Sequence, residues 1–69
     1  MTVVIQYDRD PPDDYPVLRA PFQGAGRSLY VSLSDAVENI SETTTGDVHI
    51  GYTDGDIDTI EGASIVRVS

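Results

Sequence analysis

The chain has 69 residues, no cysteine and a formal net charge of −8, with 12 acidic residues against four basic ones. A chain of this length forms one small domain, and its core buries only about 60% of the surface that the unfolded chain exposes. The absence of cysteine excludes disulfides and thiolate metal sites. Oligomerisation or a covering partner is therefore the expected source of extra stability.

The acidic composition has an unusual form, because all four basic residues are arginine and no lysine is present. With its excess of Asp over Glu, the composition resembles that of proteins from extremely halophilic archaea or their viruses. At about 1 M salt the Debye length is only about 3 Å, so a large negative charge is tolerated. A high-GC bacterial or phage origin, or acidity required by function, remains an alternative.

No targeting or membrane segment is recognisable. The apolar start of the chain is too short for a signal peptide and has no basic residues before it. No stretch approaches the roughly 18 apolar residues of a membrane helix. We expect the protein in the cytoplasm, or in a particle assembled there.

The first half of the chain predicts a strand followed by a long connection. Thr2–Tyr7 is rich in β-branched residues and alternates in polarity. Residues 8–26 contain all four prolines, which exclude regular helix and central strand, so we expect a proline-rich loop. Val17, Leu18 and Phe22 indicate that its second half packs against the core.

The second half predicts most of the sheet. Residues 27–33 alternate, with Leu29, Val31 and Leu33 on one face and Tyr30 on the other. Ser34 can cap a short helix that carries Leu33, Ala36, Val37 and Ile40 at helical spacing. Gly46-Asp47 and the two-residue hairpin signal Asp54-Gly55 mark turns. The remaining expected strands are residues 48–52, 56–60 and 63–68.

These elements predict an α+β, β-rich fold: a small antiparallel sheet, roll or barrel of about five strands with one short helix, in a single domain spanning residues 1–69.

No motif predicts catalysis. The alternating carboxylates from Asp54 to Asp58 do not fit a calcium loop, because Thr59 and Ile65 stand where Gly and Glu are needed. The acidic cluster Asp8–Asp14 lies in a loop without the rigid cleft that acid–base catalysis requires. His49 has neither a second histidine nor a cysteine as partner. We therefore expect no enzyme activity, no cofactor and no metal.

Contact residues are predicted from the aromatic side chains. Tyr30 faces away from the core row of its strand, and tyrosine is enriched in interfaces because it buries area and keeps a polar tip. The expected contact surface is Tyr30 together with the proline-rich loop. Its candidate residues are Tyr30, Tyr15, Phe22, Arg27 and Arg19.

One stretch resembles a known family. Arg27-Ser-Leu-Tyr-Val-Ser-Leu33, a short amphipathic helix, Gly46-Asp47 and Asp54-Gly55 resemble the SpoVT/AbrB swapped-hairpin domain over residues 26–60. The resemblance implies an intertwined dimer that binds DNA as a regulator or antitoxin. Ser34 stands where the family has proline. Only Arg19 and Arg27 are left to face phosphates, whose neutralisation provides most DNA affinity.

Three functions are consistent with these observations. The first is a non-catalytic interaction or structural module that acts through protein contacts, in an oligomer or a larger assembly such as a viral particle. The second is the AbrB-like DNA-binding dimer, although the charge disfavours nucleic acid. The third is an acidic DNA mimic that inhibits a basic partner.

Overall fold

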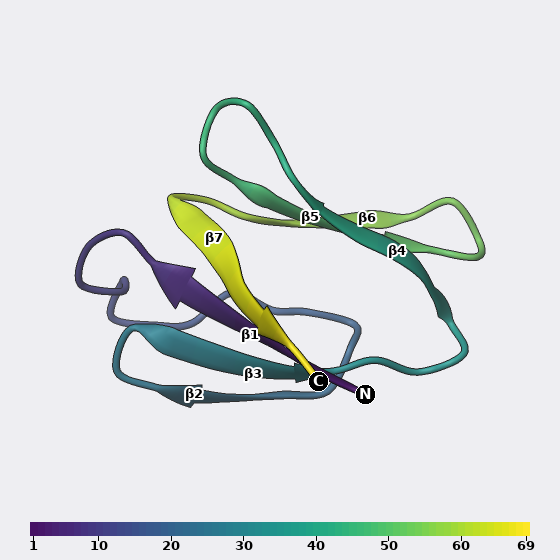
Figure 1. Cartoon of the computed structure of the whole chain (residues 1–69), viewed down its shortest axis with the longest axis horizontal. Coiled ribbons are helices and arrows are strands. Elements are labelled where there is room, and N and C mark those ends of the chain that lie inside the picture. Colours follow the sequence, from purple (N-terminus) through teal and green to yellow (C-terminus); the bar gives the residue numbers. More distant parts are fainter.

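The computed structural model describes residues 1–69 and consists of seven strands in two antiparallel sheets (Figure 1). The four-stranded sheet has the order β2-β3-β1-β7, and the three-stranded sheet has the order β4-β5-β6. The strands are β1 Thr2–Tyr7, β2 Phe22–Ala25, β3 Ser28–Ser32, β4 Val37–Glu42, β5 Val48–Tyr52, β6 Ile57–Ile60 and β7 Ala63–Val68. The chain ends meet where Thr2 and Ser69 exchange two backbone hydrogen bonds of 2.9 Å. No helix is present, and so none that could cross a membrane.

One core joins the two sheets. Eleven residues form a single buried cluster, and all but Ala20 lie on strands. Alternation along β1, β3 and β5 directs every second side chain inward, as predicted for these segments. The buried residues are Val3, Ile5, Tyr7, Ala20, Leu29, Val31, Val48, Ile50, Tyr52, Ile60 and Ala63.

The predicted α+β class is wrong, because the segment expected to be a helix is a single turn followed by β4. Ser34 accepts a backbone hydrogen bond of 3.0 Å from Val37, and pairing with β5 begins there. Val37 lies opposite Tyr52 and Asn39 opposite Gly51, so Glu38 is an extra residue in a β-bulge. The bulge brings Val37 and Ile40, three residues apart, onto the same inner face. The apparent helical spacing thus comes from an irregular strand.

The number of strands is also larger than the predicted five, because the proline-rich loop ends earlier than expected. Phe22–Ala25 forms β2 and pairs with β3 through a two-residue turn at Gly26-Arg27. Gly26 has a φ of 60°, which glycine adopts without strain at the first central position of such a turn. The irregular connection therefore covers residues 8–21 instead of 8–26.

Both hairpins of the three-stranded sheet use the same type of turn. Tyr52 N–H donates to Asp56 O, and Gly55, with a φ of 94°, donates to Tyr52 O. Thr43, Gly46 and Asp47 repeat this arrangement between β4 and β5. The Asp54-Gly55 signal correctly marks a turn, but the loop has three residues with glycine last, which is the next most common hairpin class.

Candidate interaction surface

The proline-rich loop is fixed to the β5–β6 hairpin by Arg19. Its Nη1 donates to both carboxylate oxygens of Asp54, at 2.7 and 2.8 Å, and to Asp56 at 3.1 Å. Its guanidinium carbon lies 4.6 Å from the ring centroid of Tyr52, a cation–π distance. Arg19, a predicted contact residue, is therefore engaged within the chain.

Tyr52 provides the buried part of the same attachment. Its hydroxyl accepts a hydrogen bond of 3.0 Å from the buried Ala20 N–H and donates one of 2.5 Å to Asp58. Asp58 also accepts from the backbone N–H of Arg19 at 2.8 Å. Burial, followed by the hydrogen bond to Asp58, raises the pKa of Tyr52 above its usual value. The hydroxyl consequently stays protonated and able to donate.

Acid is expected to weaken this attachment through Asp54. The backbone N–H of Asp56 and then the Arg19 guanidinium hold the pKa of Asp54 below its ordinary 3.8. A lowered folded-state pKa contributes stability above pH 3.8 that is lost as the pH falls through the folded-state value. At pH 7 the free energy of unfolding of wild type should exceed that of Asp54→Asn, and this difference should disappear toward pH ~2. Urea unfolding at each pH measures it. Asp13→Asn, at an exposed carboxylate outside every ion pair, should show no such excess.

Tyr15 and Phe22 pack together on the inner side of β2. Their rings meet edge to face with centroids 6.5 Å apart, and both rest against the core. The Tyr15 ring occupies the space beside Gly24, where a Cβ would come within 2.3 Å of it. The Tyr15 hydroxyl donates to Gly26 O at 3.0 Å. Both predicted contact residues therefore serve mainly to hold the loop against the sheet.

Arg27 is the second arginine that sequence analysis selected for contact. Its Nε and Nη2 donate to Asp10 at 3.2 and 3.1 Å, in an exposed pair that links the turn before β3 to the proline-rich loop. Exposed pairs of this kind stabilise a fold by less than about 1 kcal/mol. Arg9 and Arg67 are the two arginines outside every ion pair.

Tyr30 lies on the outer face of the four-stranded sheet, as predicted, with 43% of its surface exposed. The pairing registers place no Asp or Glu on this face, and Arg67 is its one charged residue. The chain carries 12 acidic residues, so they are gathered elsewhere, on loops, turns and the three-stranded sheet. The outward residues are Thr2, Val4, Gln6, Gln23, Ala25, Ser28, Tyr30, Ser32, Ser64, Val66 and Arg67.

A shallow hollow of about 530 Å³ is centred on this face. Thr2, Val4, Tyr30, Val66, Arg67 and Ser69 line it. A bulge produces part of its wall, because Ile65 pairs with Ile5 and Arg67 with Val4, which leaves Val66 as the extra residue. Val66 is 51% exposed. Half of the lining residues are thus apolar, and the one charged side chain among them is Arg67.

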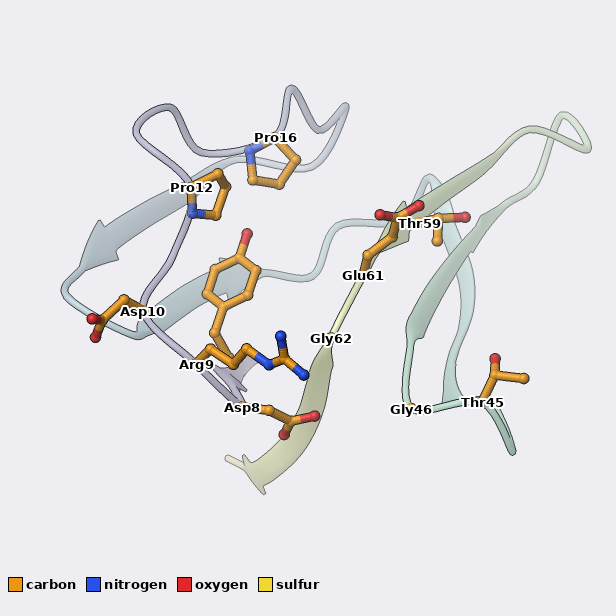
Figure 2. A pocket seen from close by; sticks show the side chains of 11 residues that line it. Asp8, Arg9, Asp10, Pro12, Pro16, Thr45, Gly46, Thr59, Glu61 and Gly62 are labelled. Carbon is orange, nitrogen blue, oxygen red and sulfur yellow. The ribbon is translucent and has the colours of Figure 1, made fainter.

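A second hollow, of about 760 Å³, separates the start of the proline-rich loop from the turns of the three-stranded sheet (Figure 2). Figure 2 shows Arg9 reaching into it, with Asp8 and Glu61 nearby. Its lining mixes charged and hydroxyl side chains with Tyr7, prolines and glycines. No group of three or more His, Asp or Glu side chains is placed to hold a metal ion.

One residue of the proline-rich loop differs from its predicted role. Leu18 and Phe22 pack against the core, as expected, but Val17 is 95% exposed. Sequence patterning indicated burial for all three, since it reports polarity and not the direction of an irregular backbone. Val17, Val4, Val66 and Arg67 are the surface residues that sequence analysis missed.

Comparison of the chain with family models, curated proteins and solved structures finds no match.

Proposed function

We propose that the chain is a non-catalytic protein-interaction module whose contact surface is the outer face of the four-stranded sheet around Tyr30. The observation that carries this proposal is the absence of Asp and Glu side chains from that face in a chain with net charge −8. Burying an unpaired carboxylate in an interface is costly, and the cores of interfaces are depleted of charge and enriched in tyrosine.

The shape of the face supports the same function. Tyr30 stands beside a hollow with two exposed or half-buried valines, Val4 and Val66, and polar residues around them. An apolar centre with a polar rim is typical of contact surfaces. The size of the domain adds to this, since covering an exposed sheet face stabilises a small core.

Capture from cells that express the tagged protein tests the proposal. Tyr30→Asp should lose a protein partner that wild type retains, because it places a carboxylate at the centre of the contact. Ile57→Asp should retain it. Ile57 is a matched control, since it is 62% exposed on β6 of the other sheet. Equal capture by wild type and Tyr30→Asp would contradict the proposed surface.

The nucleic-acid alternatives are tested by the same variants. Arg19 and Arg27, which would have to contact phosphates, are both paired with carboxylates, so we do not propose DNA binding. A basic partner that recognises the acidic loops as a DNA mimic would still bind Tyr30→Asp. The halophilic origin, the cytoplasmic location and membership of a viral assembly stay predictions from the sequence.

A further inference from the structure

We propose that the contact surface binds a second copy of this chain head to tail, with Val17 of one copy seated in the hollow beside Tyr30 of the next. This inference rests on the proposed function and names its partner. The contact joins two different regions of the chain, a protruding tip and a receiving hollow.

The tip is an exposed aliphatic side chain on an anchored loop. Val17 is 95% exposed, so it occupies no site on its own chain. Before it in the chain, the Tyr15 hydroxyl donates a hydrogen bond to Gly26 O. After it, the backbone N–H of Arg19 donates one to the Asp58 carboxylate. Leu18, the next residue, packs against the core. Because the flanking backbone is fixed, binding through Val17 orders little additional chain, and preorganisation of this kind favours affinity.

The hollow offers matching chemistry. Val4, Tyr30 and Val66 provide apolar walls for an aliphatic side chain. The outer face around them carries no Asp or Glu side chain that would have to be desolvated. A valine that leaves water for this hollow is stabilised in proportion to the apolar area that both surfaces bury.

Charge favours a copy of this chain as the occupant. Arg67 lines the hollow and lies outside every intrachain ion pair. Asp13 and Asp14 precede Val17 by four and three residues, and neither is paired within the chain. An incoming tip therefore brings carboxylates toward a free guanidinium. The long-range repulsion between copies of charge −8 is screened by salt far more than a close ion pair within the contact, so association should strengthen with salt.

A tip-to-hollow contact is heterologous, and each bound copy still presents a free tip and a free hollow. Such contacts extend into open chains or close into rings. A face-to-face dimer through two Tyr30 faces would instead be isologous and stop at two copies. One experiment distinguishes the open or ring-forming assembly from the face-to-face dimer.

Sedimentation equilibrium tests the inference by measuring the mass of the assembly. The protein concentration runs from about 10 μM to 1 mM, a range suited to weak contacts, in about 1 M KCl. Wild type should exceed the dimer mass as its concentration rises. Val17→Asp and Tyr30→Asp should each lower the association constant at least about tenfold, which is usual for central contact residues. An equimolar mixture of the two variants should form a one-to-one dimer and stop there, because it contains one intact tip and one intact hollow. Ile57→Asp should associate like wild type.

The alternative outcomes are distinct. A Val17→Asp variant that associates like wild type overturns the inference, and so does a monomeric mixture of the two variants. A wild type that stays monomeric at every concentration and salt also overturns it. If that monomer still loses a captured partner on Tyr30→Asp, the proposed function stands without this inference. Near-ultraviolet circular dichroism of each variant verifies that it is folded.

Discussion

Ile50→Ala is expected to remove a large part of the free energy of unfolding of the domain. Ile50 is fully buried at the centre of β5, between Ile40 and Asp58 on the neighbouring strands. Truncation of a buried isoleucine to alanine costs about 2–5 kcal/mol, because the cavity relaxes only in part. A domain of 69 residues is stable by only about 3–10 kcal/mol in total.

Ile57→Ala provides the matched comparison. Ile57 lies on the adjacent strand opposite Gly51 and is 62% exposed, so the same truncation should cost less than about 1 kcal/mol. Urea unfolding followed by tyrosine fluorescence and circular dichroism measures both, since the chain has no tryptophan. Similar losses of stability for the two variants would show that the two sheets do not share the core described above.

Tyr52→Phe is expected to loosen the attachment of the proline-rich loop at Ala20 and to lower stability by about 1–3 kcal/mol. The ring remains in place under Arg19, but the Ala20 N–H loses its acceptor while still buried. Asp58 loses the hydroxyl donor and keeps only the Arg19 N–H. An unsatisfied buried donor costs its full desolvation penalty, which is why one oxygen atom has a large effect here.

Two measurements check this result. Chemical unfolding should show the loss of stability, and amide hydrogen exchange should show reduced protection at Ala20. Tyr30→Phe is the control, because the Tyr30 hydroxyl takes part in no hydrogen bond and lies on the outer face. Its stability should stay within about 0.5 kcal/mol of wild type. Unchanged protection at Ala20 in Tyr52→Phe would contradict the assigned role of the hydroxyl.

Alternation was a reliable guide in β1 and β5. Val3, Ile5 and Tyr7 in β1, and Val48, Ile50 and Tyr52 in β5, are buried as the period of two predicts. It failed at β4, because the bulge at Glu38 changes the period locally to one that resembles a helix. A bulge depends on the partner strand, so no local pattern in residues 33–40 could reveal it.

The sequence by itself determined the β-rich character, the acidic and cysteine-free composition, the main turns and the outward position of Tyr30. These follow from local rules: strand alternation, glycine at turns and the chemistry of side chains. Only the tertiary structure decided that Arg19 and Arg27 are bound by carboxylates 35 and 17 residues away in the chain. It also decided that Val4, Val66 and Arg67 meet beside Tyr30 and that Val17 protrudes. The reason is that a surface is formed by strands distant in sequence, and their register and bulges are set by pairing.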